Sequence, residues 1–204
     1  MLKYGFEMEY FVFDQKTGSH VLCPDALPKD ECGYLAEARG EPHADPVSAA
    51  YLLLAEEKRL CTKAEKLGLW LDRTLPTLKL DRKLARDALR RHGKPGYSDQ
   101  RHNMYGKDYP VNNPWNRAAL HVHFSDTEEF TWTNKEGLKL SKTIHHPLDM
   151  CKYILALDKA FAKEIKTARR LPGFYEMKPH GFEYRSLPCN VDPAAVAQVI
   201  LEVK

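Results

Sequence analysis

Hydrophobic and polar residues alternate along the first segment of the chain, a pattern that predicts a β-strand. Residues 3–13, KYGFEMEYFVF, are rich in aromatic and β-branched types, which favour strands. A turn at Gly18 and a loop over 24–30, rich in proline and aspartate, separate two further predicted strands at 20–23 and 33–41. The first part of the chain is therefore expected to be mostly β-structure.

Two helices are expected to begin at an Asp-Pro pair, in which the acidic residue caps the helix and proline takes its first position. One follows Asp45-Pro46 and ends at Gly68, and the last helix of the chain follows Asp192-Pro193. Helical periodicity predicts two more, over 81–92 and over 147–170.

The remaining segments predict more strands and one long loop. Strands are expected at 69–73 and at 118–126, the latter paired with 130–133, and a second hairpin is expected at 173–188. Residues 93–117, full of Gly, Pro, Asn and Asp, are interpreted as a loop of the length that often binds a ligand. Because the helices are too few for a regular βαβ alternation, we expect an α+β fold. It would be a single domain over 1–204, with one mostly antiparallel sheet and helices packed on one face.

Composition narrows the classes of function. Hydrophobic residues make up 43% and charged residues 29% of the chain, and the net charge is only +3, so a nucleic-acid partner is not indicated. The first segment has acidic residues within its apolar run, unlike a signal peptide, and no stretch approaches the ~20 apolar residues of a membrane span. The five cysteines are scattered without a C-x-x-C pair, which favours reduced thiols and a cytoplasmic protein over a disulfide or zinc framework.

Ionisable residues recur at every second position of four predicted strands. Side chains two residues apart lie on the same face of a strand, so each of the following sets shares a face: Glu7 and Glu9; Glu37, Arg39 and Glu41; His121, His123 and Ser125; Glu183 and Arg185. Taken singly, each set is explained by a solvated sheet face, and the Glu37 set by an ion-pair ladder along the strand. Together, five carboxylates on one face would repel one another unless cations lay among them.

Carboxylates with an imidazole favour Mg²⁺ or Mn²⁺ as the cation, and arginines between them favour a nucleotide whose phosphates contact both metal and guanidinium. The chain has no P-loop and no G-x-G-x-x-G motif. An ATP site would therefore consist of sheet side chains and metal.

Three motifs resemble a known family. Glu7-x-Glu9, LHVHFS at 120–125 and KPHGFEYRSL at 178–187 look like the phage-type amidoligases of the glutamine synthetase and glutamate–cysteine ligase superfamily. The resemblance runs from the first strand almost to the C-terminus. It implies a glutamine-synthetase-like half-barrel sheet around ATP and Mg²⁺ or Mn²⁺, and, for a phage-encoded protein, the cytoplasm of a bacterial host.

The resemblance also implies roles for single residues. Glu7 and Glu9 would bind two different metal ions, with His121 and Glu183 completing the site of Glu7, while Glu37 and Glu41 are matched to the second metal by their order in the chain alone. The catalytic pair would be Arg185, which would hold the transferring phosphoryl group, and Glu183. The residues expected to contact ATP are His123, Ser125, Lys178, Arg185 and Arg39.

Two positions depart from the family pattern. Glu176 stands where family members often have arginine, and His180 where they often have an aromatic residue. No separate domain for a second substrate is evident, so acceptor recognition is expected in the loop over 93–117. Its candidates are His102, Asn103, Tyr105 and Arg117, for each of which a structural role is an equal alternative.

The function implied is a ligase that joins a carboxylate to an amine, either small molecules or peptide-borne groups, through an acyl-phosphate made from ATP. The alternatives are a small-molecule kinase on the same fold, a catalytically inactive binding module, and a metal-dependent hydrolase. The sequence leaves the acid, the amine, the general base and the oligomeric state open.

Overall fold

A computed structural model describes residues 2–30, 33–79, 81–92, 101–107, 115–133, 137–145 and 149–203. The strands are β1 (Leu2–Asp14), β2 (His20–Val21), β3 (Ala36–Arg39), β4 (Leu69–Asp72), β5 (Thr77–Lys79), β6 (Arg101–Asn103), β7 (Trp115–Arg117), β8 (Ala119–Thr133), β9 (Lys139–His145), β10 (Phe174–Lys178) and β11 (Gly181–Pro188). The helices are α1 (Pro46–Lys66), α2 (Arg82–His92), α3 (Met150–Ala160), α4 (Ala162–Thr167) and α5 (Pro193–Glu202).

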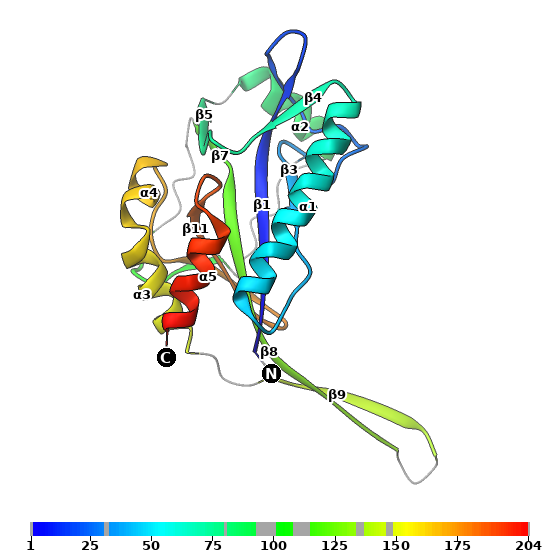
Figure 1. Ribbon diagram of the computed structural model, residues 1–204, viewed down its shortest axis with the longest axis vertical. Coiled ribbons are helices and arrows are strands. Elements are labelled where there is room, and N and C mark those ends of the chain that lie inside the picture. The colour runs from blue at the N-terminus through cyan, green and yellow to red at the C-terminus, as the bar shows by residue number, and fades with distance from the viewer. Residues whose placement is uncertain are drawn as a thin grey trace.

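The main sheet has the strand order β2-β1-β8-β11-β10-β6, with β3 and β4 also on β1 and β9 on β8 (Figure 1). The pairs of this sheet are antiparallel among the described residues, and β5 pairs with β7 in a separate two-stranded sheet. The prediction of a mixed α and β fold with a mostly antiparallel sheet is confirmed.

One face of the sheet is the hydrophobic core. Phe6, Met8 and Tyr10 of β1 are fully buried there, and so are Val122 and Phe124 of β8. Helix α1 packs on β1 and β3, and α5 contacts both α1 and α3, so these helices cover the apolar face (Figure 1). The alternate residues of the same strands therefore lie on the opposite face.

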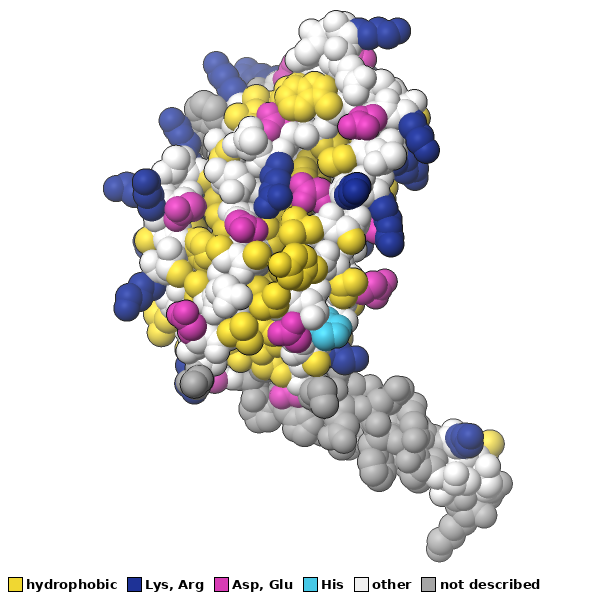
Figure 2. All heavy atoms as spheres, viewed as in Figure 1, with side chains coloured by type: hydrophobic (Ala, Val, Ile, Leu, Met, Phe, Trp, Pro, Cys, Tyr) yellow, Lys and Arg dark blue, Asp and Glu magenta, His cyan; other side chains and the backbone are white. Residues whose placement is uncertain are grey.

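The outer surface of the helix layer has dispersed charges. Viewed from this side, Figure 2 shows hydrophobic side chains between single charged ones. Among the hydrophobic residues within these helices, the most exposed are Tyr51 on α1, Leu155 on α3 and Leu201 on α5. No helix in the described part of the chain is long and apolar enough to cross a membrane.

The helix boundaries predicted from Asp-Pro pairs are confirmed. The carboxylate of Asp45 accepts a hydrogen bond of 2.8 Å from the backbone N–H of Ser48, and α1 ends at Lys66, two residues before Gly68, whose φ is +72°. Asp192 caps α5 in the same way, through the N–H of Ala194 at 3.0 Å. Each cap satisfies a backbone donor that the helix itself leaves free.

The prediction of one continuous helix over 147–170 is wrong. The segment is divided into α3 and α4 at Phe161, where φ is −113° and ψ is 25°, and its first positions, 147–148, lie outside the described residues. Phe161 is partly buried against the core. The backbone leaves helical geometry at this packed aromatic residue, a tertiary effect that periodicity does not reveal.

The hairpin predicted between 118–126 and 130–133 is also wrong, because both segments belong to the single long strand β8, which pairs with β9. No glycine or proline separates them, and Gly137, with φ +82°, comes after β8 instead.

The loop predicted over 93–117 contains two short strands, β6 and β7, while 93–100 and 108–114 lie outside the described residues. The third predicted strand is shorter than expected, at Ala36–Arg39.

The turn between β10 and β11 depends on Gly181. Its φ is +153°, and a Cβ there would lie 1.9 Å from the carbonyl oxygen of Phe124. We predict that Gly181→Ala lowers the free energy of unfolding by about 3 kcal/mol or more, because both the backbone and β8 must shift. Gly18→Ala is the matched control, with φ +65° but open space around the new methyl group, and should cost only about 1 kcal/mol. Urea unfolding measures the stability of both variants. Equal losses of stability would contradict the close approach of Gly181 to the carbonyl group of Phe124.

Candidate metal and anion site

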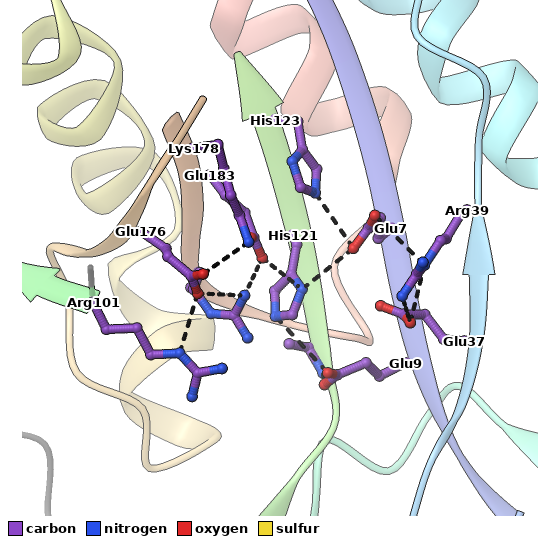
Figure 3. A network of polar contacts seen from close by, with 12 residues as sticks. Glu7, Glu9, Glu37, Arg39, Arg101, His121, His123, Glu176, Lys178 and Glu183 are labelled. Atoms are coloured by element: carbon purple, nitrogen blue, oxygen red, sulfur yellow. Dashed lines mark hydrogen bonds and ion pairs between the residues drawn. The ribbon is translucent and has the colours of Figure 1, made fainter. Parts of the chain in front are cut away.

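The face of the sheet opposite the core, here called the charged face, brings together ionisable side chains from six strands (Figure 3). Strand pairing places Glu7 between Arg39 and His121, Glu9 beside Glu37, and Glu183 between His123 and Glu176. Residues on this face alternate with the core residues of the same strands, as period two requires. The described residues of the charged face are Glu7, Glu9, Glu37, Arg39, Arg101, His121, His123, Glu176, Lys178, Glu183 and Arg185.

Two groups on this face have the spacing of metal ligands. One is Glu7, His123 and Glu183, the other Glu7, Glu37 and His121, and within each group one ligand atom per residue lies within 4.8 Å of the others. Glu7 belongs to both groups, so two cations bound here would be neighbours. Two carboxylates and one imidazole suit Mg²⁺ or Mn²⁺ better than the histidine-rich or thiolate sets of zinc.

One ring nitrogen of His123 is without a hydrogen bond in the described part of the chain. Its Nε2 is buried, lies 3.3 Å from Oε2 of Glu7, and has no hydrogen-bond partner among the described residues. A buried ring nitrogen without a hydrogen bond is costly. The residues therefore fit a cation that would use this atom together with the carboxylate of Glu7.

Opposite charges compensate one another around His121. Its Nδ1 lies 3.0 Å from Oε1 of Glu183 and 4.0 Å from Oε2 of Glu7. Burial and Arg185 oppose protonation of the ring, but Glu183 and Glu9 outweigh them and raise the pKa of His121 to about 9. Burial likewise opposes ionisation of Glu7, yet contacts with His121 and His123 hold the pKa of Glu7 well below its usual range.

Glu37 lies in the most unfavourable electrostatic position of the group. Burial, together with the charges of Glu7 and Glu9, raises the pKa of Glu37 to about 8, despite Arg39, whose Nη2 donates to its Oε2 at 2.6 Å. A divalent cation among these carboxylates would remove much of that repulsion.

The half of the charged face on β6, β10 and β11 is cationic. Lys178 Nζ lies 2.9 Å from Oε1 of Glu176 and 2.8 Å from Oε2 of Glu183. Arg185 pairs with Glu183 and is 3.4 Å from Oε2 of Glu176, and Arg101 Nε is 3.1 Å from the same oxygen. Three cations thus surround two carboxylates, next to the metal-ligand groups.

A β-bulge positions Arg185. The pairing of β11 with β8 shifts between Tyr184 and Leu187, so that Arg185 and Ser186 together oppose His121. The guanidinium of Arg170 donates to both bulge carbonyls, at 2.6 Å to Arg185 O and 3.0 Å to Ser186 O. Arg185 keeps the period-two spacing from Glu183, and the bulge, which inserts one extra residue into β11, sets it beside His121.

Some predicted metal residues lie outside the two ligand groups. Oε2 of Glu9 accepts a hydrogen bond of 2.8 Å from the backbone N–H of Ala119, and its Oε1 is 4.0 Å from His121. Glu41 is exposed beyond the end of β3. Strand β3 ends at Arg39, and its pairing with β1 resumes only at the bridge between Tyr4 and His43, one residue out of the β3 register, so the period-two face does not extend to Glu41.

The predicted nucleotide contacts are divided between the two halves. Lys178 and Arg185 belong to the cationic half, whereas Arg39 lies at the acidic edge, with 61% of its side chain exposed, and contacts Glu37 and Glu7. Ser125 is partly buried on β8, opposite Lys3 and Gly181.

The substrate candidates of the 93–117 segment have structural contacts. Asn103 donates to Pro172 O at 2.8 Å and accepts from the N–H of Tyr105, whose hydroxyl donates to Asp158 at 2.8 Å. His102 is exposed and lies beside the ring of Tyr175, and Arg117 lies in the separate β5–β7 sheet. None of these four belongs to the charged face.

Sequence reasoning missed Arg101, Arg170 and the role of Glu176. Arg101 was within the segment interpreted as a loop, and its neighbour Glu176 is 75 residues away. A signal did exist for Glu176, because it alternates with Lys178 on one strand face. No protein-family model matches the chain, and no curated protein is significantly similar to it.

Arg170 provides a test of the bulge. We predict that Arg170→Met lowers the free energy of unfolding by about 1–3 kcal/mol, because two carbonyls lose a charged donor. Lys166→Met, at an exposed position of the neighbouring helix α4, is the control and should change it by less than about 0.5 kcal/mol. Chemical denaturation measures both, and an unaffected Arg170→Met would show that the bulge does not need the guanidinium.

Proposed function

We propose that the protein is an ATP- and Mg²⁺- or Mn²⁺-dependent carboxylate–amine ligase with a glutamine-synthetase-like fold, similar to the phage-type amidoligases. The observation that supports this most strongly is the composition of the charged face. It has an oxygen-rich set of metal ligands directly beside a cationic set, on one antiparallel sheet and without a P-loop. Phosphoryl transfer requires these two kinds of group side by side.

The metal would lie on the acidic strands β1, β3 and β8 and at their border with β11, which carries Glu183. Glu7, His123 and Glu183 would bind one cation, and Glu7, Glu37 and His121 a second. A divalent cation there would neutralise phosphate oxygens of ATP as negative charge develops on them.

The cationic half would act on the transferring group. Arg185 and Lys178 are partly exposed, with 21% and 25% of their side chains accessible, and would donate to phosphoryl oxygens. A carboxylate oxygen of the acid substrate attacks the γ-phosphorus, and ADP leaves. The amine nitrogen then attacks the carbonyl carbon, phosphate departs with that oxygen, and the nitrogen loses a proton to give the amide.

The alternatives differ in how well the charged face supports them. A hydrolase with catalytic zinc commonly uses two or three histidines per metal, whereas each group here has one. A binding module without activity would not need buried carboxylates at 1% and 5% exposure, as Glu183 and Glu37 have. A kinase would use the same residues, so only the fate of the phosphoryl group separates it from a ligase.

The metal assignment predicts a large effect at the shared ligand. Glu7→Gln should weaken Mn²⁺ binding by at least about tenfold, or roughly 1.4 kcal/mol, because Glu7 belongs to both ligand groups. Glu41→Gln, an exposed carboxylate close in sequence to Glu37, should leave the affinity unchanged. Calorimetric titration of the folded variants with Mn²⁺ measures this, and equal affinities in all three proteins would exclude the site.

The ligase assignment predicts the path of one oxygen atom. Heavy oxygen from a labelled carboxylate substrate should appear in inorganic phosphate in step with amide formation, because that oxygen bridges carbon and phosphorus in the acyl-phosphate. Candidate acids can be screened with hydroxylamine, which traps acyl-phosphates as hydroxamates, and mass spectrometry of the phosphate reads the label.

Arg185→Ala should slow this transfer by on the order of 10²–10³-fold, since it removes a donor to the developing charge. Arg59→Ala, an exposed arginine of α1 that pairs with Glu56, is the control. Phosphate labelled only from water would identify a hydrolase, and a stable phosphorylated product would identify a kinase.

A further inference from the structure

Glu176 is a buried carboxylate with three cationic neighbours. Its side chain is 9% exposed, and its two oxygens lie 2.9 Å from Lys178 Nζ, 3.1 Å from Arg101 Nε and 3.4 Å from Arg185 Nη1. It belongs to neither group of metal ligands among the described residues. Its contacts are those of an anion held by a phosphate-binding or carboxylate-binding cluster.

The position of Glu176 is electrostatically unusual. It lies directly opposite Glu183 in the β10–β11 pair, and like charges in such a position destabilise a sheet. Lys178 and Arg185 each contact both carboxylates and so compensate the repulsion. Arg101, from the neighbouring strand β6, contacts Glu176 (Figure 3).

The three cations are more accessible than the carboxylate they surround. Their side chains are 29% exposed for Arg101, 25% for Lys178 and 21% for Arg185, against 9% for Glu176. An anion that arrives from solvent would therefore meet N–H donors before it met the carboxylate. Those donors are already partly engaged by Glu176.

We propose that Arg101, Lys178 and Arg185 form a binding site for phosphoryl oxygens, and that Glu176 is its built-in competitor. An incoming anion must take N–H donors from Glu176, so the site discriminates against singly charged anions and favours a ligand with several negative charges, such as a di- or triphosphate. The inference rests on the proposed function only in naming phosphate as the anion. It adds Arg101 as a third cation of the site and gives Glu176 a role in setting its specificity.

The test measures binding of inorganic pyrophosphate by calorimetry, without metal, nucleotide or substrate. Glu176→Gln keeps the shape of the side chain and removes its charge, and should raise pyrophosphate affinity by at least about tenfold, as expected when a charge-assisted hydrogen bond is released to the ligand. Glu202→Gln, exposed near the end of α5, changes the net charge equally and should have no effect. Arg101→Gln combined with Glu176→Gln should reverse most of the gain.

A second titration with glutarate identifies the kind of oxyanion. A gain for pyrophosphate well above that for glutarate supports the phosphoryl site, whereas an equal or larger gain for glutarate would overturn it in favour of a site for the acid substrate. Unchanged or weaker pyrophosphate binding in Glu176→Gln would also overturn it, because Glu176 would then only position the cations.

A milder variant covers the case in which Glu176→Gln does not fold. Glu176→Asp retains the charge but draws the carboxylate back toward the strand, and should give a smaller rise in pyrophosphate affinity, with no rise contradicting the proposal. These titrations involve neither metal nor turnover. If the titrations give the expected affinities but the protein never forms an amide, the anion site is supported and the ligase assignment is rejected.

Discussion

The register of β1 between its neighbours is the constraint on which both faces of the sheet depend. Phe6, Met8 and Tyr10 are fully buried on one side of this strand, while Glu7 and Glu9 lie on the other. A slip of one residue would exchange the two sets, placing carboxylates under the helices and aromatic rings on the charged face. The apolar packing that stabilises the fold thus also fixes the position of the ionisable groups.

Charge compensation is the second requirement of this arrangement. Buried carboxylates on neighbouring strands are tolerable only with opposite charges close by. The chain provides these charges unevenly. Around Glu183 and Glu176 they come from Lys178, Arg185 and Arg101, whereas Glu7, Glu9 and Glu37 share mainly two imidazoles and Arg39. The acidic side is the one that would gain most from a divalent cation, and the cationic side is the one that would gain from an anion.

This uneven compensation links the proposed ligase activity to the proposed anion site. A nucleotide with its metal would bring positive charge to Glu7 and Glu37 and negative charge to Lys178 and Arg185. Each half of the face would then receive charge opposite to its own. The bulge held by Arg170 contributes to this division, because it places Arg185 at the boundary, next to both His121 and Glu183. The same geometry is compatible with transfer to any oxygen nucleophile, which is why the labelled-oxygen experiment decides between ligase and kinase.

The sequence by itself determined the local features of this protein. Period two along KYGFEMEYF, LHVHFS and GFEYRS identified the strands and the residues on their polar side, and the Asp-Pro pairs located two helices. These predictions succeed because alternation and capping depend on residues close in sequence. Only the tertiary structure decided which strands are neighbours, and so placed Arg101 on Glu176, left the exposed Glu41 outside the ligand groups, and made β8 one long strand. The physical reason is that strand pairing is set by contacts between distant segments packed on a common core, and no local pattern records such contacts.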